Sequence, residues 1–254
     1  MTRFFLALLP AVFATALAFG QISPIPVGPL PFSSVCTTQT PAVTNIGANG
    51  TSSGSTVTIT GVTVPSGSLI VVVVAEIAST TIGGTVSDGV NTYSSAGGIF
   101  INNSSANGFI NTFYAPNASL SSGTITYTKQ TSPHVAGISA IYSSNIVLSS
   151  ALDSAVTATA GGSSSTPSVT SGTPVKSGEL FVGAVGNSTD GGTIVVTQDS
   201  GHGWAFPPNT DGVVTVIAGG NQVNSGVGTK VFAPTLNQST PWAASVVGFF
   251  PKCS

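Results

Sequence analysis

The nine residues SGSLIVVVV (Ser66–Val74) decide the fold, because a related stretch, SGELFVGAV (Ser177–Val185), follows them at an offset of 111 (177 − 66). Each stretch joins a Ser-Gly turn to an uninterrupted apolar run. The first run is rich in β-branched residues, which favour strands, and its continuity is typical of a strand buried on both faces. The copy predicts two similar β halves.

Two further positions match at the same offset. Asp88 and Tyr93 correspond to Asp199 and Trp204, with no gap between them and the apolar runs. The halves are therefore expected over about residues 56–150 and 165–250.

Between the halves, Gly161–Ser168 (GGSSSTPS) has the composition of a flexible linker, and we interpret it as a hinge. Alternating residues in Thr56–Thr60 and Thr124–Thr128 indicate half-buried strands, and Asp88-Gly89 indicates a turn. No segment has a convincing helical period. Many short strands separated by turns predict an all-β fold, a single jelly-roll-like β-sandwich built from the two repeated halves over residues 38–254. The alternative is two separate small domains.

Charge is scarce in this chain. It has 5 Lys and Arg and 7 Asp and Glu among 254 residues, whereas an average soluble protein has about 25% charged residues. The few lysines are far apart, which argues against nucleic acid and against anionic membrane surfaces as partners. Hydrophobic residues make up 41% of the chain, which is enough for a sizeable core and opposes disorder.

The N-terminus has the pattern of an export signal. Arg3 precedes the apolar stretch Phe4–Ala18, and small residues follow near Gly20, so residues 1–20 are expected to be removed. No later stretch is apolar and long enough to span a membrane. Residues 21–37 form a Pro-rich arm, which is either a linker along the sandwich or a segment donated to a neighbouring subunit.

Two cysteines, Cys36 and Cys253, bracket the whole predicted sandwich. An even number in an exported chain favours one disulfide within the chain. Free thiols or a bridge between chains remain the alternatives. Because only two distant histidines accompany the cysteines, no zinc site is expected.

Candidate catalytic side chains are few and scattered. A glycosidase needs two carboxylates about 5–10 Å apart, but most acids here lie in turns. Glu76 is the exception, because it directly follows an apolar strand; we interpret it as a strand-end residue that reaches solvent. No Gly-x-Ser-x-Gly motif accompanies His134 or His202, and no catalytic residue, cofactor or metal is expected. The remaining acids considered are Asp88, Asp153, Glu179, Asp190, Asp199 and Asp211.

Three aromatic residues are the candidate ligand-binding side chains: Tyr93, Trp204 and Trp242. An exposed aromatic ring stacks on a sugar through its apolar face. The alternative is a role in the core, favoured by the correspondence of Tyr93 with Trp204. A calcium site around Asp88, Asn91 and Thr92 is also conceivable, but a structural turn is the better interpretation.

Six short motifs stand out along the chain: Ser66–Val74, Ser87–Tyr93, Tyr114–Asn117, Ile141–Ser143, Leu152-Asp153 and Pro241–Ala244. Together they resemble the jelly-roll-type β-sandwich modules of secreted and cell-surface bacterial proteins. The resemblance covers about residues 56–250 and implies a module that accompanies carbohydrate-active or adhesive proteins. It gives no catalytic residues to assign.

Three functions follow from these observations. The first is a secreted, non-catalytic module for adhesion or for binding a neutral polysaccharide. The second is a structural subunit of an extracellular filament or surface layer, with copies of itself as partners, because an uncharged surface protects poorly against self-association. The third is a glycoside hydrolase-type enzyme, for which the sequence offers the least.

Overall fold

The computed structural model describes residues 37–51, 53–77, 81–101, 107–130, 135–187, 194–197, 199–205, 217–223 and 226–253. Several predicted features lie outside these residues. They are the expected signal peptide, nearly all of the arm 21–37, Cys36, His134, Asp190 and Asp211. The described part holds fourteen β-strands, one short 3-10 helix and no α-helix. Its paired strands are antiparallel. The all-β prediction is therefore confirmed.

The larger sheet has six strands in the order β1-β6-β2-β5-β3, and β4 also pairs with β5. Long strands β2 and β5 form its centre. The bounds are β1 Ala42–Thr51, β2 Thr56–Ile77, β3 Thr85–Ser87, β4 Ser94–Ile101, β5 Gly108–Thr128 and β6 Ala136–Ser144.

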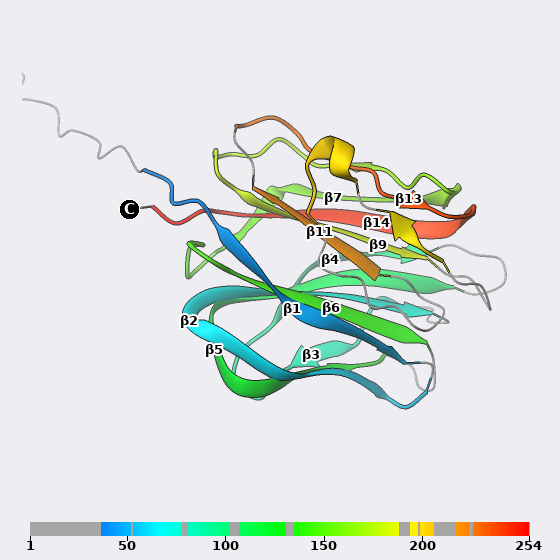
Figure 1. Ribbon diagram of the computed structural model, residues 1–254, viewed down its shortest axis with the longest axis horizontal. Helices are drawn as coiled ribbons and strands as arrows, with labels where there is room; N and C mark the ends of the chain where they lie inside the picture. Colours follow the sequence, from blue (N-terminus) through cyan, green and yellow to red (C-terminus); the bar gives the residue numbers. More distant parts are fainter. Residues whose placement is uncertain are drawn as a thin grey trace, which may run out of the picture. The chain divides into compact units, whose positions relative to one another are not determined.

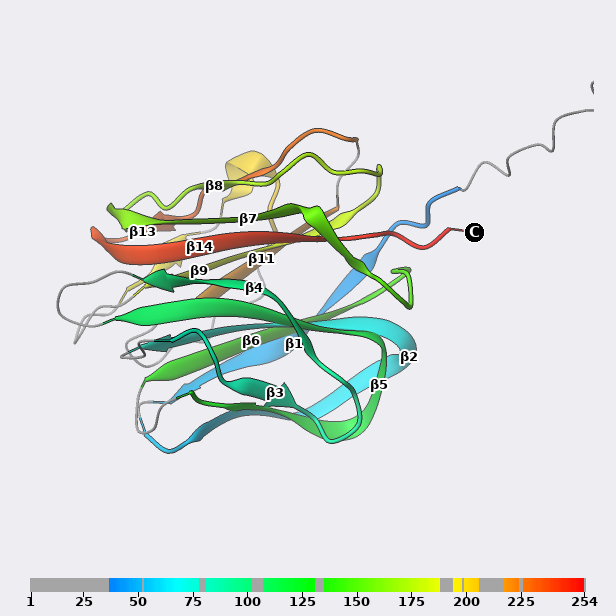
Figure 2. The ribbon, with the colours of Figure 1, turned by 180° about the vertical axis from the view of Figure 1, so that it is seen from behind.

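A second sheet has four strands in the order β11-β9-β14-β7. Figure 1 shows it above the six-stranded sheet, and Figure 2 shows the same two layers from behind. Its bounds are β7 Leu152–Ser164, β9 Leu180–Asn187, β11 Ile217–Val223 and β14 Thr240–Phe249. Two short ladders and the 3-10 helix complete the described part: β8 Val169–Thr170 with β12 Val231–Phe232, β10 Val196–Thr197 with β13 Thr235–Leu236, and η1 Ser200–His202.

The apolar run of β2 explains how the layers pack. Successive side chains of a strand point to opposite faces. The odd-numbered residues from Leu69 to Ala75 share a hydrophobic cluster with residues of β9 and β14. The even-numbered residues from Ile70 to Val74 share a different cluster with the first half of the same strand. The run is therefore buried on both faces, as its sequence predicted.

Strands β2 and β5 bend sharply, and this bend encloses the hydrophobic cluster that contains Ile70, Val72 and Val74. Gly61 and Gly67 in β2 have φ of 70° and 78°, where a side chain would be strained. Asn117 and Ser122 take positive φ in β5, beside register shifts between the two strands. The paired strands consequently curl, as Figure 1 shows at the edge of the larger sheet, and their two halves enclose one cluster.

The predicted hinge at Gly161–Ser168 is wrong for its first half. Gly161–Ser164 belongs to β7 and pairs with Thr240–Ala243 of β14. The edge strand β7 tolerates small residues here. Pairing with β14 orders the segment, although its composition is that of a flexible linker.

Both large sheets use the same order of strands. Within β1, β2, β5 and β6, the fourth strand lies between the first and second, and the third lies beyond the second. Strands β7, β9, β11 and β14 follow the same order. A duplicated half would produce this pattern, although the duplication and the jelly-roll sandwich remain predictions.

The two ends of the described part lie together. Thr38 and Cys253 form an isolated antiparallel bridge, and the Gln39 N–H donates to the Lys252 carbonyl at 2.8 Å. Since Cys36 lies outside the described residues, its disulfide with Cys253 stays a prediction.

Candidate functional site

The turn after β3 is held by the carboxylate of Asp88. Its Oδ1 accepts hydrogen bonds from the N–H groups of Val90 and Asn91, at 2.9 and 2.7 Å. Its Oδ2 accepts from the Asn91 amide at 2.7 Å and from the Tyr93 hydroxyl at 2.9 Å. Asn91 in turn bonds both the N–H and the carbonyl of Ser119. These bonds occupy the polar groups of the turn, so it acts as a clamp between the β3 turn and β5.

The protonation of this clamp follows from its bonds. Burial by itself would raise the pKa of Asp88, but the hydrogen bonds from Asn91, Val90 and Tyr93 together bring it below its ordinary value. Burial and the bond to Asp88 raise the pKa of the Tyr93 hydroxyl. A hollow of about 390 Å³ lies beside the clamp, with Val90 exposed at its rim.

Glu76 is fully buried, so the prediction that it reaches solvent is wrong. Its Oε2 accepts hydrogen bonds from the Tyr127 hydroxyl at 2.7 Å and the Gln130 N–H at 2.9 Å. Burial, followed by the bond to Glu76, raises the pKa of Tyr127. Burial lowers the pKa of Lys129, and the negative charge of Glu76 opposes that change. Glu76 therefore anchors the end of β5 to β2.

A third group of acids, Glu179 and Asp153, lies at the four-stranded sheet. Glu179 immediately precedes β9 and is fully buried, and Asp153 in β7 is 3% exposed. Glu179 Oε1 accepts from the Lys176 N–H at 2.7 Å, and Oε2 is buried with no hydrogen-bond partner among the residues that the structure describes. Asp153 Oδ1 accepts from the Ala155 N–H at 2.9 Å. Burial, together with the negative charge of Asp153, raises the pKa of Glu179 to about 7. Because both carboxyls are buried, neither is exposed to a sugar in solution.

The aromatic candidates occupy positions with little free ring surface. Trp204 is 1% exposed, stacks edge-on against Phe232 at 4.9 Å, and donates its indole N–H to the Val231 carbonyl. Trp242 is 7% exposed and donates its indole N–H to the Ser164 hydroxyl at 3.0 Å. Tyr93 is half-buried and held by Asp88. Ligand binding by these three stays a prediction, and the structure does not bring them to one surface patch.

His202 is the histidine that the structure describes. Its Nδ1 lies 2.6 Å from Asp199 Oδ1, and its side chain is half exposed. The other oxygen of Asp199 accepts from the Ala233 N–H at 2.6 Å. The aspartate thereby joins η1 to the chain after β12. In the described part of the chain, no group of three or more His, Cys, Asp or Glu side chains could hold a metal ion.

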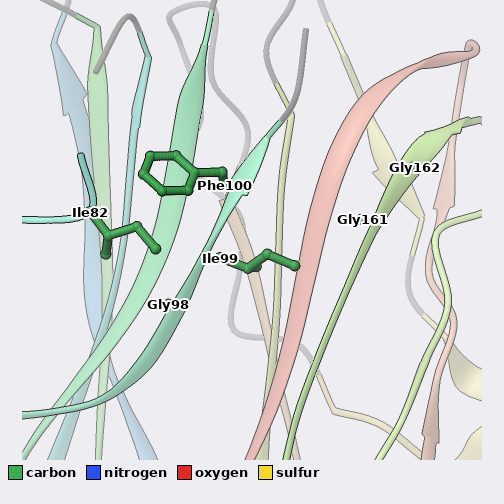
Figure 3. Close-up of a pocket in the computed structure, with 6 residues that line it drawn as sticks. All are labelled: Ile82, Gly98, Ile99, Phe100, Gly161 and Gly162. Atoms are coloured by element: carbon green, nitrogen blue, oxygen red, sulfur yellow. The ribbon is translucent and has the colours of Figure 1, made fainter. Parts of the chain in front are cut away.

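The candidate binding site is a groove between strands β4 and β7, with a volume of about 510 Å³. We call it the β4–β7 groove. Its volume falls within the range of about 300–1,000 Å³ that is usual for ligand sites. Figure 3 shows Ile99 pointing from β4 toward β14 and β7, with Phe100 and Ile82 on the other side of β4. The lining residues are Ile82, Gly98, Ile99, Phe100, Gly161 and Gly162.

Glycines shape the walls of this groove. A Cβ on Gly98 would lie 2.6 Å from the Ile110 carbonyl oxygen, so the wall is glycine because β5 passes close behind it. A Cβ on Gly162 would lie 3.1 Å from the Trp242 ring, which supports this wall from behind. On Gly161, by contrast, a Cβ would meet nothing closer than 3.4 Å. That Cβ would make ordinary contacts with the Trp242 and Phe100 carbonyl oxygens and with Ile99, so a side chain at Gly161 is tolerated and would enter the narrow groove where β7 comes close to β4.

Both strands along the groove are edge strands of their sheets. Among the described strands, β4 pairs only with β5, and β7 pairs only with β14. Their outer backbone groups are free of ladder partners in this part of the chain, which is the arrangement that accepts an extended segment. This site was not among the sequence predictions, although the glycine pairs Gly97-Gly98 and Gly161-Gly162 were a signal that could have located it.

No family model, curated protein or solved structure matches this chain. Among the described residues, no helix is long and apolar enough to cross a membrane.

Proposed function

We propose that this protein is an extracellular, non-catalytic binding module that holds an extended, uncharged polymer in the β4–β7 groove. The observation that carries the proposal is the groove itself, which runs along two edge strands and is lined by three apolar residues and three glycines. Adhesion to a neutral polysaccharide or to a protein segment is the corresponding activity.

The lining explains why the ligand is uncharged. None of the six lining residues carries a charge, so a charged group would lose hydration there without gaining a partner. Ile82, Ile99 and Phe100 offer apolar contact, and the glycines let a chain approach the backbone. Free N–H and carbonyl groups along an edge strand can hydrogen-bond either sugar hydroxyls or a peptide backbone.

The acidic groups support a non-catalytic module. Asp88 and Glu76 already accept hydrogen bonds from named donors, and Glu179 is buried against Asp153. None of the four lines the β4–β7 groove. A hydrolase would need a pair of carboxylates at the ligand.

Export supports the extracellular setting. The expected signal peptide at residues 1–20 and the two cysteines at the ends of the predicted sandwich agree with it. We also propose that Cys36 and Cys253 pair within the chain, since the neighbouring Thr38 already pairs with Cys253.

A binding panel tests the proposed function. The mature chain from Gln21 is titrated with β-glucan, xylan, dextran and an uncharged Pro-rich peptide, and binding is measured by calorimetry. We expect saturable binding to at least one probe. Gly161→Leu should weaken it at least ten-fold, because the added side chain enters the groove from a position with room for its Cβ.

Ser154→Leu is the matched control. It places the same leucine side chain at an exposed position of the same strand, outside the groove. Binding should be unchanged in this variant. Equal affinity in the Gly161 variant and the control, or no binding to any probe, would overturn the proposed site.

A further inference from the structure

We propose that the segment held in the β4–β7 groove is the Pro-rich arm Gln21–Val35 of a second copy of this protein, so that molecules join head to tail. The proposal rests on the proposed function, because it names the polymer that the groove binds. It also commits to one of the two roles that the sequence left open for the arm.

The chemistry of the arm matches the groove. Gln21–Val35 (QISPIPVGPLPFSSV) contains no charged residue, and the groove lining contains none either. Apolar side chains recur along the arm at Ile22, Ile25, Val27, Leu30 and Phe32. These side chains would be covered by Ile82, Ile99 and Phe100.

The prolines favour docking of a preformed extended chain. Pro24, Pro26, Pro29 and Pro31 fix φ near the polyproline II value, so less conformational entropy is lost on binding. Pro-rich segments of this kind dock in grooves lined by aromatic side chains. Phe100 supplies the aromatic ring, and the glycine walls leave room for the proline rings.

The distance along the molecule favours a second copy over the chain's own arm. The described chain begins beside Cys253, where Thr38 pairs, whereas Gly162 of the groove pairs with Trp242. Eleven residues separate Trp242 from Cys253, which is about 35 Å at ~3.3 Å per residue. A fifteen-residue polyproline II arm spans about 46 Å. An arm reaching its own groove would therefore have only a few residues left to fill it.

This placement also determines the type of assembly. The described chain begins near the C-terminal end of β14, and the groove lies near the N-terminal end of that strand. A contact between two different surfaces is heterologous, and it extends into open chains unless a rotation closes a ring. The low charge of the protein removes the repulsion that would limit such growth.

Complementation between two variants tests the proposal on the mature, oxidised chain. One variant carries Leu30→Ser and Phe32→Ser in the arm and keeps its groove. The other carries Gly161→Leu in the groove and keeps its arm. Mass is measured by light scattering after size exclusion at several protein concentrations.

We expect the unaltered chain to form species whose mass grows with concentration. Each variant alone should stay monomeric, and an equal mixture should form a dimer, because one arm fits one intact groove. The dimer would also show that the arm variant, which supplies the groove, is folded; urea denaturation checks the fold of the Gly161→Leu variant. Ser154→Leu is the control and should assemble like the unaltered chain.

The outcomes separate this proposal from the proposed function. A monomeric unaltered chain, or variants that do not combine, would overturn docking of a second copy. If the arm variant then bound the polymer panel more tightly than the unaltered chain, the chain's own arm would be the occupant. If the groove variant lost panel binding while assembly never occurred, the proposed function would stand alone. If Gly161→Leu changed neither readout, both would fail.

Discussion

Two buried glutamates, one in β2 of the six-stranded sheet and one just before β9 of the four-stranded sheet, have opposite surroundings. Glu76, near the end of β2, accepts hydrogen bonds from the Tyr127 hydroxyl and the Gln130 N–H. Glu179, at the entry to β9, accepts one from the Lys176 N–H and lies near the negative charge of Asp153. Both side chains have no exposed surface.

The difference teaches that burial alone does not determine the role of a carboxyl. Donors around Glu76 compensate the loss of hydration, whereas a second acid beside Glu179 adds to that loss. Consequently burial and Asp153 raise the pKa of Glu179 to about 7, and that group can keep a proton in neutral solution. Glu76 joins strands, and we expect Glu179 to make the stability of the fold depend on pH.

The largest expected effect comes from removing Glu76. In Glu76→Ala, the buried Tyr127 hydroxyl and Gln130 N–H lose their acceptor and a cavity remains. We expect the free energy of unfolding to fall by about 3–4 kcal/mol, measured by urea denaturation at pH 7. Tyr127→Phe is the matched control and should cost only about 1–2 kcal/mol, since Glu76 keeps its other donor. Equal losses in the two variants would show that the hydroxyl alone accounts for the effect.

Glu179 should give the second largest effect, and it depends on pH. The unfolded carboxyl has a pKa of 4.5, and burial with the charge of Asp153 raises the folded pKa to about 7. Between these values the folded chain holds a proton that the unfolded chain has released. Stability should therefore fall as pH rises from 4.5 to 7, by on the order of 2 kcal/mol, and level off above that.

Glu179→Gln tests the source of this slope. Glutamine stays neutral at every pH, so the fall in unfolding free energy between pH 4.5 and 7 should disappear. Asp153→Asn should lower the pKa of Glu179, followed by the ¹³C shift of its carboxyl. A Gln variant with the same slope as the unaltered chain would assign the pH dependence to another group.

The central strands could be predicted from the sequence because their own side chains specify them. Leu69–Val74 is a continuous apolar run, and Thr124–Thr128 alternates; both lie in described strands. The edge strands β1 and β7 could not be predicted in this way. Residues such as Gly161 and Gly162 have little strand preference, and they are ordered by the β14 backbone that pairs with them.

The candidate site was missed for the same reason. Its walls come from glycines on two edge strands far apart in sequence, which only the packing of the two sheets brings together. Burial of Glu76 was also hidden, because the polar donors that allow it follow 51 and 54 residues later. The Asp88-Gly89 turn, by contrast, was visible, since Asp88 bonds residues within its own turn and Gly89 has a φ of 77°.

Removing the Asp88 carboxylate should have the smallest effect on the free energy of unfolding. The pH dependence of that effect should be opposite in direction to that of Glu179. Despite the cost of burial, bonds from Asn91 and Val90 lower its pKa, so its stabilising contribution is present above the ordinary carboxyl pKa and is lost in acid. Because the turn is partly solvated, Asp88→Asn should cost under about 1 kcal/mol at pH 7. The difference from the unaltered chain should shrink as the pH falls below 4, in urea titrations with Glu179→Gln as the background. A difference that grew in acid would mean that Asp88 resembles Glu179, and burial would then outweigh hydrogen bonding even in an open turn.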